Sequence, residues 1–227
     1  MKRALSAAAA MTALAALTAV ASADHRAGHP DTTNPNLSIA ADPLVQTWPR
    51  QVAISGDLKV QDSAGKTIEL QANPHPFNGS FKEVATTTTN SQGEYTFVTR
   101  PDEHTIYRAV ADLNPDETSG EITVRSRMKV TRRVNNRTPE DGDTITFFGR
   151  VSPAHEGMDV RIQRRRRTGT WKTMTTTPLG EAQSDNTSLY STELTITRDG
   201  RWRAKVRSDE NHLGNKSRSI RINVLGE

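Results

Sequence analysis

The chain of 227 residues contains no cysteine. This excludes the disulfide bonds that staple many small exported domains, as well as thiol catalysis and metal sites built from cysteine. Any domain must therefore be held together by its own hydrophobic core. Aromatic residues make up only 5% of the chain, which favours small cores built around one or two rings each.

The sequence also lacks the motifs of common hydrolytic sites. The six histidines show no His-Glu-Xaa-Xaa-His spacing, and there is no Gly-Xaa-Ser-Xaa-Gly turn. His104, beside Asp102 and Glu103, is the best candidate for a catalytic histidine, but a loop histidine among carboxylates is normally solvated. We therefore predict a protein that is not an enzyme and has no cofactor.

Long hydrophobic runs are confined to the beginning of the chain. Lys2 and Arg3 precede an Ala/Leu-rich stretch that ends in Ala21-Ser22-Ala23. This order of charge, apolar run and small residues is typical of a secretory signal peptide, and the stretch is shorter than a membrane-spanning helix requires. We predict that residues 1–23 are a signal peptide and that the mature chain is secreted, without a membrane span.

The rest of the chain has the pattern of many short strands. Residues 24–36 are polar and show no periodicity, so we expect a disordered lead-in. From Leu37 onward, short runs of alternating apolar and polar residues are bounded by Gly, Pro, Asn and Asp. The dipeptide Asp199-Gly200 predicts a hairpin turn. The sequence therefore predicts an all-β fold.

The alternating pattern occurs twice, about 95 residues apart, in segments 52–126 and 143–224. Apolar and aromatic residues appear in the same order in both copies. The first copy has Ile54, Gly56, Ile68, Phe81, Tyr95, Tyr107, Ala109 and Ile122, and the second has Phe147, Gly149, Val160, Trp171, Tyr190, Trp202, Ala204 and Ile220. We predict two domains, 37–126 and 127–227, each long enough for a core and with roughly seven strands in a two-sheet sandwich.

Several segments carry a family resemblance. Val52-Ala53-Ile54-Ser55-Gly56, Phe81-Lys82-Glu83-Val84 and Gly93-Glu94-Tyr95-Thr96-Phe97 resemble the immunoglobulin-like or fibronectin type III-like repeats of exported bacterial proteins. The second copy matches in segments 146–153, 160–165 and 169–172, but it has Ser188-Leu189-Tyr190 where a Gly-Xaa-Tyr turn is expected. The resemblance covers nearly the whole mature chain and implies two tandem immunoglobulin-like β-sandwich domains. Such repeats serve as adhesive, spacer, carbohydrate-binding and enzyme-appended modules, so the resemblance implies a scaffold rather than an activity.

The two copies differ in charge. Residues 24–126 contain 8 Lys/Arg and 14 Asp/Glu, a net charge of −6, whereas residues 127–227 contain 20 and 12, a net charge of +8. By alternation, most basic residues of the second copy fall on outward positions of neighbouring strands, and four consecutive arginines continue into a hairpin. The predicted cationic face consists of Arg161, Arg164, Arg165, Arg166, Arg167, Arg201, Arg203, Lys205, Arg207 and Arg221.

This face has three interpretations. In the first interpretation, the face binds a polyanion, such as an anionic cell-wall polymer or glycan, because arginine forks suit phosphate and carboxylate. In the second, it is the solvated face of a structural spacer, where charge discourages association between sheet edges. In the third, it contacts the acidic first domain. Nucleic acid is a weaker ligand candidate, since no recognition helix and few outward aromatic residues are expected; an envelope or secreted protein is a further possible partner.

Other residues are assigned structural roles. Phe81 and Trp171, each just after a hairpin glycine, are expected to cap one end of their sandwich. We predict no metal site, since the two oxygen- and nitrogen-rich segments, Asp24-His25 with His29 for Cu(II) and 112–117 for Ca²⁺, lack a convincing ligand spacing.

Overall fold

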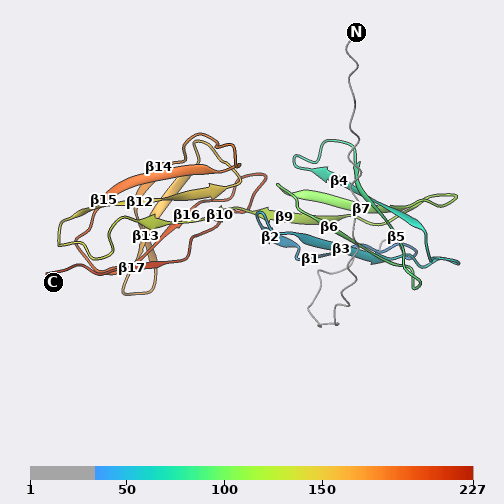
Figure 1. Cartoon of the computed structure of the whole chain (residues 1–227), viewed down its shortest axis with the longest axis horizontal. Helices are drawn as coiled ribbons and strands as arrows, with labels where there is room; N and C mark the ends of the chain where they lie inside the picture. Colours follow the sequence, from blue (N-terminus) through green and yellow to red (C-terminus); the bar gives the residue numbers. More distant parts are fainter. Residues whose placement is uncertain (1–33, 227) are drawn as a thin grey trace, which may run out of the picture.

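The computed structural model describes residues 34–226, and all regular secondary structure in this range is β-strand (Figure 1). The all-β prediction is therefore confirmed. None of these residues forms a helix, and hence none forms a helix that is long and apolar enough to cross a membrane. The predicted signal peptide and residues 24–33 of the predicted lead-in lie outside the described range. Residues 34–36 of the predicted lead-in lie within the described range, where Asn34 and Asn36 donate side-chain hydrogen bonds to the carboxylate of Glu117.

The first half of the chain forms two sheets around one core. One sheet has the order β1-β3-β6, and the other has the order β2-β9-β7-β4-β5, with β8 paired to β7. All pairs are antiparallel except β2 with β9. The strands are β1 (Ala40–Asp42), β2 (Val45–Thr47), β3 (Val52–Asp57), β4 (Thr67–Pro74), β5 (Lys82–Thr88), β6 (Glu94–Thr99), β7 (Thr105–Ala111), β8 (Glu117–Thr118) and β9 (Ile122–Arg127).

The second half repeats this arrangement. Strand β12 pairs with β15 and with the short β10 and β11, and the opposite sheet has the order β14-β13-β16-β17. The strands are β10 (Lys129–Val130), β11 (Arg133–Val134), β12 (Thr144–Ser152), β13 (Asp159–Arg165), β14 (Trp171–Pro178), β15 (Ser188–Thr195), β16 (Gly200–Lys205) and β17 (Ile220–Ile222).

Each half has a hydrophobic cluster of its own between its two sheets. The first contains Ile54, Leu70 and Tyr107, and the second contains Phe147 and Trp202, whose ring centroids lie 5.3 Å apart. These residues alternate with outward polar residues along their strands, because successive side chains of a strand point to opposite faces. The predicted hairpin at Asp199-Gly200 is wrong, since β15 and β16 belong to different sheets. The Asp199 carboxylate instead accepts a hydrogen bond from the Val224 amide.

A buried glycine and tyrosine recur at the same place in both halves. Tyr190 pairs with Gly149 across the sheet, and its hydroxyl donates a 2.8 Å hydrogen bond to the Thr131 carbonyl. Tyr95 pairs with Gly56 and donates a 2.5 Å bond to the Ser38 carbonyl. Burial raises the pKa of both tyrosines, which keeps their hydroxyl groups protonated as donors. The absence of a side chain at the glycine lets the tyrosine and the neighbouring backbone come this close.

The two halves are joined by backbone hydrogen bonds as well as by the chain itself. Leu213, in the loop between β16 and β17, donates from its amide to the Ser126 carbonyl at 2.9 Å and accepts from the Met128 amide at 3.0 Å. Segment 102–104 of the first half meets segment 209–212 of the second, where the His104 amide donates to the Asn211 carbonyl at 3.0 Å. Trp48 lies at this junction and donates to the Asp102 carboxylate at 2.9 Å.

Candidate polyanion-binding face

The outer face of the β14-β13-β16-β17 sheet carries a cross-strand array of basic side chains. In the register of this sheet, Arg161 lies opposite Lys205, and Arg201 lies opposite Arg221. Their neighbours Trp202 and Ala204 point the other way and are buried in the core. The strand alternation read from the sequence therefore placed these four residues correctly on one face.

The hairpin between β13 and β14 extends this array. It closes through hydrogen bonds from the Arg166 amide to the Thr170 carbonyl at 2.7 Å and from the Gly169 amide to the Arg166 carbonyl at 3.0 Å. Gly169 has φ +86°, a left-handed conformation that favours glycine. Arg165, Arg166 and Arg167 are exposed. A hollow of about 670 Å³ is lined by Arg164, Arg165, Arg166, Arg167, Arg198 and Asp199.

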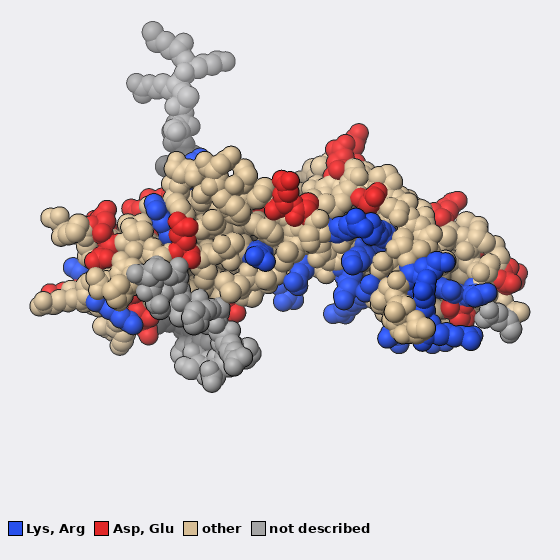
Figure 2. Space-filling model, turned by 180° about the vertical axis from the view of Figure 1, so that it is seen from behind, with Lys and Arg blue, Asp and Glu red and all other residues tan. Residues whose placement is uncertain are grey.

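These positive charges are largely unneutralised. Of the ten predicted residues, only Arg221 has a carboxylate within 4.0 Å among residues 34–226, and its partner Asp199 lies 3.9 Å away. Both side chains of that pair are exposed, so water screens their attraction. Figure 2 shows Lys and Arg concentrated on one side of the second half, whereas the first half shows interspersed positive and negative groups. No ion pair of described residues joins the two halves, so the predicted charge contact between them is not seen.

Arg203 differs from its neighbours because it is tied into the fold. Its Nε donates a 2.9 Å hydrogen bond to Gln163, and its guanidinium lies 4.0 Å from the centre of the Trp171 ring. The first half repeats this trio, with Arg108 donating to Gln71 at 2.8 Å and stacking on Phe81 at 4.1 Å. Burial lowers the pKa of Arg203. The prediction that Trp171 and Phe81 cap the sandwich is wrong, since both rings lie on the outer face under an arginine.

We expect Arg203→Ala to destabilise the second half by about 1–2 kcal/mol, because it removes a stacking contact and a charge-assisted hydrogen bond. Arg201→Ala removes the same charge from an exposed position and is expected to change stability by less than about 0.5 kcal/mol. Urea unfolding followed by tryptophan fluorescence measures both values. Equal losses for the two variants would show that the Arg203 trio does not contribute to stability.

Arg164 was predicted to belong to the outward run, and this is wrong. It pairs with Trp202 on the inward side of the sheet, at a position that the first half fills with the buried Ala72 opposite Tyr107. Its aliphatic stem lies over Gly200, where an added Cβ would be 3.2 Å from the Arg164 Cγ. Arg207 is exposed but lies beyond the end of β16 and takes no part in the cross-strand pairs.

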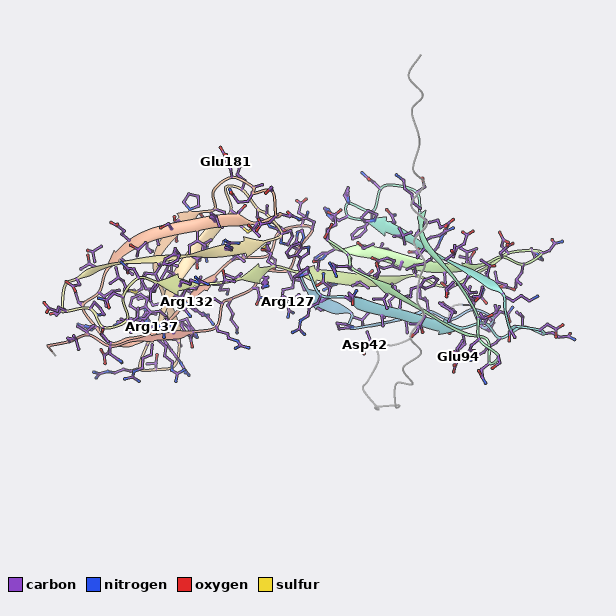
Figure 3. All side chains as sticks on the ribbon, in the orientation of Figure 1. Asp42, Glu94, Arg127, Arg132, Arg137 and Glu181 are labelled. Carbon is purple, nitrogen blue, oxygen red and sulfur yellow. The ribbon has the colours of Figure 1, made fainter. Side chains whose placement is uncertain are left out.

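Several basic residues that the sequence analysis did not name adjoin the array. Arg132, Arg133 and Arg137 line a second hollow of about 510 Å³ together with Arg221. Arg132 donates to the Arg218 carbonyl at 3.0 Å, and burial lowers its pKa. Figure 3 shows Arg132 and Arg137 close together in the second half, and Arg127 at the junction. Arg133 lies in the two-residue strand β11 (Arg133–Val134), and Arg132 and Arg137 lie in no strand, so no alternating pattern marked these three residues.

Three of the six histidines, which show no metal-site spacing in the sequence, come together at the junction. The rings of His155 and His212 have centroids 4.6 Å apart, and His104 lies 6.3 Å from His212. They come from three different loops, which explains why no sequence spacing revealed them. The segment 112–117, considered for Ca²⁺, has its Glu117 carboxylate occupied by the side-chain amides of Asn34 and Asn36, while Asp24, His25 and His29 lie outside the described residues.

A comparison with models of known protein families and with curated proteins finds no match. The function of this chain must therefore be argued from the face and the junction themselves.

Proposed function

We propose that this chain is a secreted, non-catalytic binding protein that docks to an anionic polymer or glycan of the cell envelope through the outer β14-β13-β16-β17 face. The docking residues are Arg161, Arg165, Arg166, Arg167, Arg201, Lys205 and Arg221. The observation that carries the proposal is their placement on one sheet face and its hairpin, with a single carboxylate partner among the described residues. We further propose that each half is an immunoglobulin-like sandwich of the type that the sequence resembles.

The geometry of a sheet favours a repeating ligand. Neighbouring strands lie about 4.8 Å apart, and alternate residues of one strand about 6.7 Å apart, so the array presents cations at short, regular intervals. A flexible polymer with a phosphate or carboxylate on each unit contacts several of them at once. The guanidinium fork of arginine binds such groups through two parallel hydrogen bonds.

The one aromatic ring on this described face, Trp171, is not free to stack on a sugar, which favours recognition by charge. Trp171 is half-buried, and the Arg203 guanidinium covers its ring at 4.0 Å. A sugar ring would have to displace this contact in order to stack. We therefore expect affinity to follow the charge density of the polymer and to fall with salt.

A structural spacer is the second candidate function. It is favoured by the backbone hydrogen bonds of Leu213 across the junction, which hold the two halves to each other independently of any ligand. In that case the basic face is a solvated surface, and the chain binds no polyanion at physiological ionic strength.

The test is a titration of the mature protein with long-chain inorganic polyphosphate and with poly-L-glutamate at several salt concentrations. We expect Arg165→Gln/Arg166→Gln/Arg167→Gln to weaken binding about tenfold or more. The salt dependence should become less steep, because binding through fewer cationic contacts releases fewer counterions from the polymer. The matched control, Lys59→Gln/Lys66→Gln/Lys82→Gln, removes the same charge from the first half and is expected to change binding less than about twofold. Equal losses would mean that net charge alone governs binding. Failure of the unaltered chain to bind either polymer would favour the spacer.

A further inference from the structure

Three potential metal ligands from two loops of the second half converge at the junction. His155 lies between β12 and β13, and Asp209 and His212 lie between β16 and β17. Their ligand atoms all lie within 4.8 Å of one another. His155 Nε2 is 3.1 Å from His212 Nδ1 and 3.0 Å from Asp209 Oδ2. His212 is buried, with 4% of its surface exposed.

The outer hydrogen bonds of the two histidines determine where their protons lie. His155 Nδ1 is 2.7 Å from the Pro153 carbonyl, and His212 Nε2 is 2.6 Å from the Asp102 carbonyl. A carbonyl oxygen only accepts, so each of these nitrogens carries a hydrogen. In the neutral rings the facing atoms, His155 Nε2 and His212 Nδ1, are then lone pairs. Together with the carboxylate they form a group of three acceptors with no hydrogen between them.

A cation among these three acceptors would relieve their mutual repulsion, and the geometry fits a metal ion. A tetrahedral Zn²⁺ with ligand bonds of 2.0–2.1 Å has ligand-to-ligand separations of about 3.3 Å, close to the two short separations found here. Metal-bound histidines usually donate their other N–H to a carbonyl or carboxylate, as both rings do. His104 is not a ligand through Nδ1, which accepts from the Ser126 amide at 3.1 Å.

We propose that His155, Asp209 and His212 form a binding site for a divalent transition-metal ion, and that Zn²⁺ fits this donor set best. Two imidazoles and one carboxylate are hard-to-borderline ligands, and they leave a fourth coordination position for water. The ion would also order the junction. His212 reaches the first half through Asp102, and the adjacent Asn211 donates to Glu103 at 3.3 Å and accepts from the His104 amide.

The site is tested by titrating the metal-free full chain with Zn²⁺ in a calorimeter and with Co²⁺ in a spectrophotometer. His25→Gln/His29→Gln serves as the background, so that these two histidines do not contribute to metal binding. We expect one saturable site per chain and a visible Co²⁺ spectrum of tetrahedral type. His155→Gln, His212→Gln and Asp209→Asn are each expected to weaken binding about tenfold or more, since even second-shell losses cost that much. His75→Gln, which changes a histidine outside the three ligands, should leave it unchanged.

A measurement on the unsubstituted chain keeps the proposal testable if a variant misfolds. Long-range ¹⁵N–¹H spectra report which ring nitrogens carry protons, and addition of Zn²⁺ should shift His155 Nε2 and His212 Nδ1 while their outer nitrogens stay protonated. Absence of saturable Zn²⁺ binding, or equal affinity in the three ligand variants and His75→Gln, would overturn the proposal. A proton shared between the two rings, unaffected by Zn²⁺, would do the same.

Discussion

Substitution of Gly149 by alanine is expected to destabilise the second half by about 3 kcal/mol or more. A Cβ at this position would lie less than 3.0 Å from the Thr131 carbonyl oxygen and from the Tyr190 hydroxyl. The backbone on one side and a buried ring on the other leave no flexible neighbour to move. Relief of the clash would break the hydrogen bond between Tyr190 and Thr131. Because domains are stable by only about 5–15 kcal/mol, the loss is large.

Urea unfolding of Gly149→Ala, read from the Trp202 fluorescence of the second core, measures this effect. Gly180→Ala is the control, because its added Cβ would meet only the Leu189 carbonyl at 3.5 Å, an ordinary contact. We expect the equivalent Gly56→Ala to destabilise the first half in the same way. A Gly149→Ala protein as stable as Gly180→Ala would mean that the strand moves aside at little cost.

Phe147→Ala is expected to cost about 3–5 kcal/mol, the range for removal of a buried phenylalanine. The Phe147 ring is fully buried and lies against Trp202 at 5.3 Å between centroids. The neighbouring Phe148 points out of the same strand and is 37% exposed, so Phe148→Ala is a control of identical chemistry. It is expected to cost less than about 1 kcal/mol.

Thermal or urea unfolding of both variants compares two adjacent residues that differ only in the face they occupy. The unfolded second half of Phe147→Ala should also lose polyphosphate binding at temperatures where Phe148→Ala retains it. Similar losses of stability in both variants would contradict the assignment of the core to the Phe147 side of β12.

The sequence predicted the outward array where one face of a strand is buried, since burial fixes which residues point inward. Trp202 and Ala204 mark the inward positions of β16, so Arg201 and Lys205 could be placed on the other side. In β13 the buried Val160 and Ile162 mark the inward positions in the same way, so alternation also places Arg164 inward, and the prediction that grouped it with Arg165, Arg166 and Arg167 overlooked this mark. Gly200 in β16 has no side chain and leaves room for the Arg164 stem on that inward side.

Interactions that combine residues from several strands or loops could not be predicted from the sequence. The Arg203 trio takes one residue from each of β13, β14 and β16, and the junction histidines come from loops whose contact depends on how the two halves meet. No local periodicity encodes such convergence. The same trio occurs in the first half, where Gln71, Phe81 and Arg108 occupy the equivalent positions. An alignment of the two copies would therefore have shown that these three residue positions recur together.

The three tryptophans of the chain occupy three different environments. Trp48 lies at the junction against Asp102, Trp171 lies under Arg203 on the basic face, and Trp202 is buried in the second core. Variants that keep one tryptophan at a time thus provide separate optical probes of bending between the halves, of ligand docking and of unfolding. The protein carries its own spectroscopic reporters for each of these events, without an added label.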